Sequence, residues 1–147
     1  MKKTSLILLT FLITFGIQAQ TQIDNGGFEA WENIPGGSEP ENWNSFLTGG
    51  GSLSSMAQNQ IASSTDVRPG SSGTKSAYIW SNKIAGIIAN GNMTIGKINM
   101  GAVQPTHADN YNRTIRSDAD FNQPLTDSPT GIKFWVKFTP KSVNDGS

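Results

Sequence analysis

The sequence predicts an all-β protein built from antiparallel strands, and three observations support this class. No segment carries a sustained apolar period of about 3.6 residues, which argues against long helices. Short runs rich in β-branched and aromatic residues recur, separated by stretches rich in glycine, asparagine and serine that are typical of turns. Charged residues make up only 15% of the chain and 16 residues are glycine, a composition that suits a domain with many turns.

The first predicted strands lie in the N-terminal half of the chain. Gly27 to Asn33 is the first, and Phe28 is its expected core residue. Trp43 to Leu47 forms a second short run, while Leu53 to Ala57 and Gln60 to Ser64 are weaker strand candidates. These runs are short and separated by glycine-rich stretches, so we expect short strands joined by loops.

Ala77 to Ser81 is a clearer strand, and its pattern places two aromatic rings together. Successive side chains of a strand point to opposite faces, so Tyr78 and Trp80 share one face. The smaller side chains of Ala77, Ile79 and Ser81 occupy the other face.

A hairpin is predicted after this strand. Ile84 to Ala89 and Met93 to Met100 flank Asn90 and Gly91, a pair that tolerates the positive φ angles of a tight turn. The polar stretch from Gln104 to Asp120 is then expected to be a long loop.

The last predicted strand runs from Gly131 to Thr139. Side chains alternate between the two faces of a strand, so Lys133, Trp135 and Lys137 share one face. The other face carries the apolar side chains of Ile132, Phe134, Val136 and Phe138. A turn is expected at Asp145 and Gly146, and such a turn normally leads into a partner strand. We therefore expect residues 20–147 to be the N-terminal part of one domain that continues further.

The N-terminus has the layout of a secretion signal. A basic head at Lys2 and Lys3 precedes the apolar run from Thr4 to Ile17, and Ala19 suits cleavage before Gln20. The alternative is a membrane anchor, but the apolar run is shorter than the ~20 residues that a span needs. The expected location is therefore secreted or at the cell surface. The chain has no cysteine, which excludes disulfides and a lipoprotein anchor.

Composition also limits the classes of function. The chain has 11 basic and 11 acidic residues, so it lacks the excess of positive charge that is typical of nucleic-acid-binding proteins. His107 is the one imidazole, which argues against zinc chemistry and against a serine hydrolase. A glycosidase needs two carboxylates, and none of the acidic residues stands in a recognisable catalytic motif. An enzyme is therefore the least favoured class.

Three sequence clusters, taken in order, resemble one family. They are NGGFEAW at residues 25–31, GTKSAYI at 73–79, and FNQPLT at 121–126 followed by IKFWVKFTP at 132–140. The set resembles the carbohydrate metabolism domain (PCMD) family of secreted proteins from Bacteroidetes-type bacteria. The first two clusters also resemble carbohydrate-binding modules with a galactose-binding-like jelly roll. The resemblance implies an antiparallel β-sandwich of the jelly-roll type and sugar-related binding, but no reaction.

The resemblance also implies a structural calcium ion beside the first strand. Glu29 is the matching acidic residue, Asp24 and Asn25 are its neighbours, and Ser76 closes a loop whose carbonyls are further candidate ligands. An alternative of equal weight is that Glu29 is a surface residue on an edge strand. Asp24 and Asn25 would then only shape a turn.

Aromatic side chains are the candidate sugar ligands, because the C–H faces of sugar rings stack on tryptophan and tyrosine. Trp80, Trp135 and Tyr78 are the expected binding residues, whereas Trp31 and Trp43 are expected to be structural. The alternative for each ring is core packing. We therefore expect a non-catalytic module that binds a polysaccharide or other glycan, with a structural or adhesion sandwich as the alternative.

Overall fold

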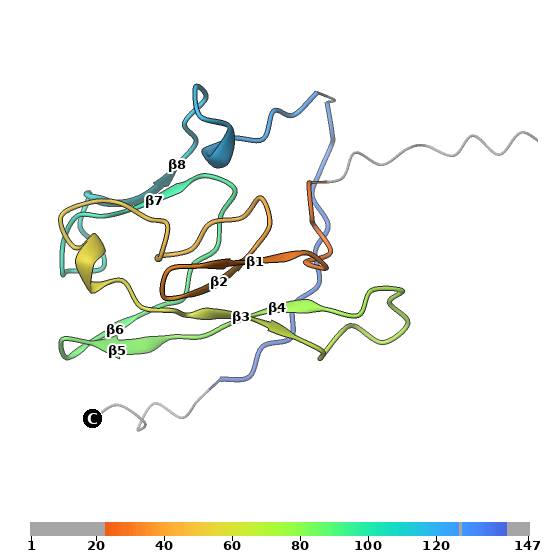
Figure 1. The fold of residues 1–147 in the computed structure, drawn as a ribbon, viewed down its shortest axis with the longest axis horizontal. Coiled ribbons are helices and arrows are strands. Elements are labelled where there is room, and N and C mark those ends of the chain that lie inside the picture. The colour runs from red at the N-terminus through yellow and green to blue at the C-terminus, as the bar shows by residue number, and fades with distance from the viewer. Residues whose placement is uncertain (1–22, 127, 141–147) are drawn as a thin grey trace, which may run out of the picture.

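The computed structural model describes residues 23–126 and 128–140, and strands dominate this part of the chain (Figure 1). Every sheet is an antiparallel pair of strands that are consecutive in the chain. The pairs are β1 (Trp31–Ile34) with β2 (Gly37–Pro40), β3 (Ile61–Ser64) with β4 (Ser76–Ile79), β5 (Asn82–Ile84) with β6 (Ile87–Ala89), and β7 (Lys97–Met100) with β8 (Asn110–Arg113). The two helices are single 3-10 turns, η1 (Ser54–Met56) and η2 (Ala119–Phe121). The predicted all-β, antiparallel class is confirmed.

The pairs are arranged in tiers (Figure 1). The β3–β4 and β5–β6 pairs run along the lower side of the view, β1–β2 lies in the middle, and β7–β8 lies above. β2 packs against β3. The segment between β2 and η1 makes two isolated bridges, Gly50 with Asn99 of β7 and Asn44 with Thr94, which precedes β7. The tiers are thus joined by single bridges and side chains and not by one continuous sheet.

The core is small and carries polar side chains. Ile61 and Ile98 are the buried hydrophobic residues of the described part, at 0% and 2% exposure. They lie on β3 and β7, which belong to different tiers. The buried polar residues are Glu39, Asn44, Ser45 and Gln60. Because a buried polar group is costly without a partner, their hydrogen bonds help to determine how the tiers fit together.

Several predicted strands are found, with shifted ends. β3 falls within the predicted Gln60–Ser64 strand, and β4 overlaps the predicted Ala77–Ser81 strand but begins and ends earlier, with Ile61 opposite Ile79. β1 begins at Trp31 and not at Gly27, because residues 24–27 form a turn and Phe28 has a φ of 57°. Phe28 is half-buried and is not a core residue.

Two other predicted strands are wrong. Trp43 to Leu47 contributes only the bridge at Asn44, and Leu53 to Ala57 contains the 3-10 helix η1 instead of a strand. The predicted loop from Gln104 to Asp120 in turn contains β8 and most of η2. β8 is largely exposed and polar, so it lacks the apolar alternation by which strands are recognised.

The hairpin predicted at Asn90 and Gly91 is also wrong. The turn falls at Ala85 and Gly86, whose φ angles of 49° and 86° are the two positive values that a type I′ turn requires. Gly91 is required for a different reason. A Cβ atom there would lie 2.4 Å from Ile79 Cγ2 and 2.6 Å from the carbonyl oxygen of Trp80. The chain therefore passes too close to the end of β4 for any side chain at that position.

Residues 131–139 form no strand in the structure, because none of them enters a β-ladder among the described residues. Their apolar side chains are exposed, at 73% for Ile132, 72% for Phe134 and Val136, and 80% for Phe138. The predicted signal peptide and the turn at Asp145 and Gly146 lie outside the described residues. Within the described ranges, no helix is long and apolar enough to cross a membrane.

Candidate functional site

Glu29 joins the N-terminal turn to the loop at residues 73–76. One carboxylate oxygen, Oε1, accepts hydrogen bonds from the backbone N–H groups of Thr74 at 2.9 Å and Lys75 at 3.1 Å. The other oxygen, Oε2, accepts from Thr74 Oγ1 at 2.8 Å, and Lys75 Nζ donates to the Glu29 carbonyl at 2.9 Å. The donor from Lys75 N and then that from Thr74 Oγ1 are the main reasons why the pKa of Glu29 lies below its ordinary value.

The neighbouring residues of the predicted calcium site have structural partners. The Asn25 amide donates to the carbonyls of Ala30 and Glu41, both at 2.9 Å, and accepts from Ala30 N. Ser76 Oγ donates to the Asp66 carbonyl at 3.0 Å. The Asp24 backbone carbonyl accepts from the indole of Trp43, whose ring also packs edge-on against another aromatic side chain.

The 73–76 loop contacts Glu29, but it presents N–H donors to the carboxylate and not the carbonyl oxygens expected of calcium ligands. Among the described residues, no group of three or more histidine or acidic residues could hold a metal ion. The donors around Glu29 fit a carboxylate brace better than a cation cage, because a cation would compete with the N–H groups for the same oxygens. Calcium binding at Glu29 remains a prediction. It predicts that Ca²⁺ raises the Tm of the unmodified chain and does not raise the Tm of Glu29→Gln.

Tyr78 and Trp80 form an aromatic pair at the end of β4. Their rings are stacked, with centroids 5.4 Å apart and an interplanar angle of 25°. Tyr78 is 58% exposed, and Trp80 is half-buried. The residue opposite Tyr78 on β3 is Ala62, whose methyl group is too small to cover a ring. The predicted shared face of these two residues is confirmed by this contact.

Trp135 is separate from the aromatic pair in its contacts. It is 66% exposed, and the guanidinium of Arg68 lies 4.7 Å from its ring centre. Lys133 also approaches the ring, at 5.6 Å. Both contacts are cation–π interactions with a tryptophan, the best ring for this interaction. The exposed ring of Trp135 is thus partly occupied by two cations.

A recess of about 580 Å³, called here the acidic hollow, lies against the β1–β2 hairpin and η2. Its lining residues include Trp43, Asn42, Asn44, Thr48 and the four acidic residues Glu32, Glu39, Glu41 and Asp120. Glu39 is 1% exposed, and its Oε1 accepts from Ser45 N at 2.6 Å and from Thr48 Oγ1 at 3.0 Å. This buried carboxylate ties β2 to the loop that follows it.

The acidic hollow was not predicted from the sequence, because the β1–β2 hairpin that forms part of its wall was not predicted. The available signal was the Pro35–Gly36 pair, since proline followed by glycine commonly forms a turn, and Gly36 has a φ of 92°. The hairpin places Glu32 directly opposite Glu39.

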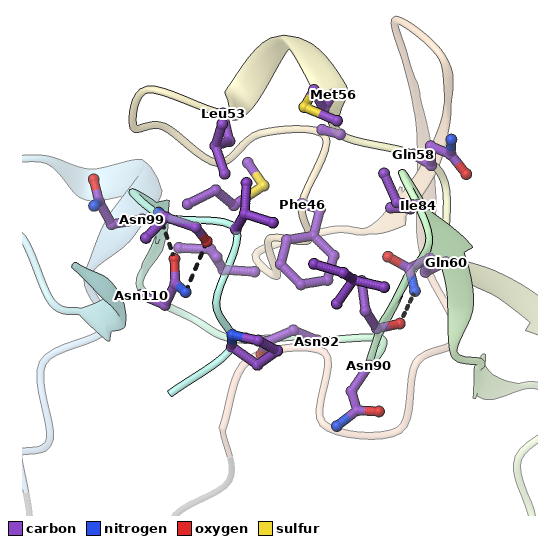
Figure 2. Close-up of a pocket in the computed structure, with 18 of the residues that line it drawn as sticks. Phe46, Leu53, Met56, Gln58, Gln60, Ile84, Asn90, Asn92, Asn99 and Asn110 are labelled. Carbon is purple, nitrogen blue, oxygen red and sulfur yellow. Dashed lines mark hydrogen bonds between the residues drawn. The ribbon is translucent and has the colours of Figure 1, made fainter. Parts of the chain in front are cut away.

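A second recess, called here the apolar cavity, has a volume of about 440 Å³. Figure 2 shows Phe46, Leu53 and Ile84 around it, with Gln60 and several asparagines at its edge. Segments from five parts of the chain line it, so no local sequence pattern could have predicted it. No protein-family model, curated protein or solved structure matches this chain, so its function is argued from the geometry alone.

Proposed function

We propose that this chain is an exported, non-catalytic carbohydrate-binding module with an antiparallel β-sandwich of the jelly-roll type. The observation that carries the proposal is the stacked pair of Tyr78 and Trp80, in which the Tyr78 ring is exposed and the Trp80 ring is half-buried. Exposed aromatic rings in a soluble domain are costly unless a partner covers them, and sugar rings offer the apolar C–H faces that such platforms bind.

Polar groups beside the aromatic pair support this assignment. Ser81 follows Trp80 and its Oγ donates to Asn90 Oδ1 at 3.1 Å. Ser81 and Asn90 are both exposed, so this polar pair is accessible to solvent close to Trp80 in the chain. Stacking on the rings would orient a sugar, and hydrogen bonds from amide and hydroxyl groups would select among its hydroxyls.

The test is a titration of the folded chain with plant, host and bacterial polysaccharides, read by tryptophan fluorescence. We expect saturable binding of one glycan class, and we expect Trp80→Ala and Tyr78→Ala each to raise Kd by about tenfold or more. Trp135→Ala tests the third predicted binding ring separately, because the ring contacts of this exposed tryptophan are with Arg68 and Lys133 and not with Tyr78 or Trp80. No response to any glycan from a folded protein would favour a structural or adhesion domain.

Glycoside hydrolysis is a second candidate with one observation in its favour. Glu32 and Glu39 are cross-strand partners and both line the acidic hollow. Partners directly opposite have Cβ atoms about 4.5–5.5 Å apart, which is compatible with a carboxylate pair. Glu39 also braces the fold, so Glu32 is the residue to test. Hydrolysis of aryl glycosides that falls about a hundredfold in Glu32→Gln would establish the enzyme, and no turnover would exclude it.

A further inference from the structure

The apolar cavity contains one polar atom without a partner. Gln60 is 2% exposed, and its Oε1 is the buried side-chain atom that lacks a hydrogen bond among the described residues. Gln60 lines the cavity, and Figure 2 shows its carboxamide at the cavity wall. Such an acceptor is costly to bury unless something donates to it.

The orientation of this carboxamide is determined by its other end. Gln60 Nε2 donates to the carbonyl of Ala89 at 2.7 Å and to that of Trp80 at 3.1 Å. Both partners are acceptors, so only the nitrogen can face them. The oxygen must therefore be the free end of the group.

Three other amides that line the cavity, those of Asn92, Asn110 and Asn112, are paired at both ends or with each other. Asn92 and Asn112 donate to each other's side-chain oxygens, at 3.0 and 3.1 Å. Asn110 donates to the carbonyls of Ala102 and Gln104 and accepts from Gly101 N and Ala102 N. Gln60 Oε1 is thus the polar atom of the cavity wall that still needs a donor.

We propose that the apolar cavity binds a small ring alcohol or phenol, whose hydroxyl donates to Gln60 Oε1. The remaining wall is mainly apolar, with Phe46, Leu53, Ile84, Ile87, Ile98 and Met100 around the space. A volume of about 440 Å³ lies within the range of small-molecule sites. A sugar fits this wall poorly, because most of its hydroxyls would be left without partners. The cavity is therefore a binding site separate from the aromatic pair of Tyr78 and Trp80, which is proposed to bind glycan.

The experiment compares three ligands of similar shape on the unmodified folded chain. 4-Methylphenol has a hydroxyl donor, 4-methylanisole has an oxygen that only accepts, and p-xylene has no oxygen. NMR or calorimetric titration should show saturable binding of 4-methylphenol, with Kd about tenfold lower than for the other two, as one hydrogen bond to a buried acceptor predicts. Equal affinity for all three would overturn donor recognition, and no binding of 4-methylphenol would overturn the site.

Two variants locate the binding. Ala57→Phe fills part of the cavity and should weaken all three ligands. Gln60→Met keeps the length of the side chain but removes its oxygen, so it should abolish the preference for 4-methylphenol. The ligand comparison in the unmodified chain does not depend on the folding of either variant. Trp80→Ala should weaken glycan binding by about tenfold or more and leave the Kd for 4-methylphenol unchanged, so the two proposals can fail separately.

Discussion

At the scale of single residues, Glu29 shows how one carboxylate couples stability to pH. Its pKa lies below the ordinary 4.5 because Lys75 N and Thr74 Oγ1 donate to the ionised form. The unfolded chain therefore binds a proton more readily than the folded chain. The stabilisation is fully present above the unfolded-state pKa, and it is lost as the pH falls through the lower folded-state pKa.

Replacing Glu29 by glutamine should lower Tm at neutral pH and make the acid-side loss of Tm shallower. Glutamine keeps the shape but carries no charge, so it cannot titrate. Melting curves by circular dichroism at pH values from about 7 to about 3 would measure both effects. Glu41→Gln is the matched control, since the Glu41 side chain is exposed and accepts no hydrogen bond within the described ranges. An unchanged pH slope in Glu29→Gln would contradict the assignment.

Asn110 offers a residue-scale test with a larger effect. Its amide nitrogen donates to the carbonyls of Ala102 at 3.0 Å and Gln104 at 2.8 Å. Asn110→Asp replaces the donor by a carboxylate oxygen facing two acceptors, so the free energy of unfolding should fall by roughly 2–3 kcal/mol. Urea denaturation would measure it. Asn112→Asp disturbs one exposed amide pair and should lower the free energy of unfolding clearly less. Equal losses in the two variants would argue against the stabilising role of the Asn110 amide.

At the scale of elements, the β5–β6 hairpin depends on two left-handed residues. Ala85 holds a φ of 49°, which L-residues with a Cβ atom disfavour, and Gly86 holds 86°. Ala85→Asn should raise the free energy of unfolding by about 0.5–1 kcal/mol, because asparagine tolerates this region better.

Gly86→Ala is the reciprocal test of the same turn. A Cβ atom at Gly86 would meet nothing within 4 Å, so its cost is conformational and not steric. We expect a loss of about 1 kcal/mol in the free energy of unfolding. Thermal or urea denaturation of the two variants should therefore give shifts of opposite sign. Shifts of the same sign would mean that the turn does not adopt this conformation.

The same hairpin shows where the sequence was a poor guide. The pair Asn90 and Gly91, which follows this hairpin, is a strong turn signal in the sequence. The structure has no turn there, and position 91 requires glycine because the chain passes close to Ile79 and Trp80. A close approach depends on tertiary packing, and a single sequence does not report it. By contrast, the alternation in β4 correctly predicted that Tyr78 and Trp80 share a face, because that property is local.

The candidate sites divide in the same way. The aromatic pair lies on one strand and was predictable from the two-residue period. The Glu29 contact was reached only through the family resemblance, since Thr74 is distant in the sequence. The apolar cavity could not be predicted at all, because Gln60 becomes its acceptor only after the carbonyls of Ala89 and Trp80 fix its amide nitrogen.

At the scale of the whole molecule, the described chain buries little apolar surface and exposes much of it in one segment. Ile61 and Ile98 are its buried hydrophobic residues, whereas residues 132–138 expose four large apolar side chains in an alternating pattern. A contiguous apolar stretch of high β-propensity that is not paired in a sheet tends to add to another strand or to associate.

The purified chain should therefore self-associate as its concentration rises, and the apolar face of this segment should drive the association. Sedimentation velocity over a concentration series would measure it. Phe134→Ser with Phe138→Ser should shift the distribution toward the monomer, because these changes remove the apolar face. Lys133→Ser, on the other face of the alternating pattern, is the matched control and should leave association unchanged. Association that persists equally in the double variant would place the contact elsewhere, and the exposed ring of Tyr78 would be the next residue to test.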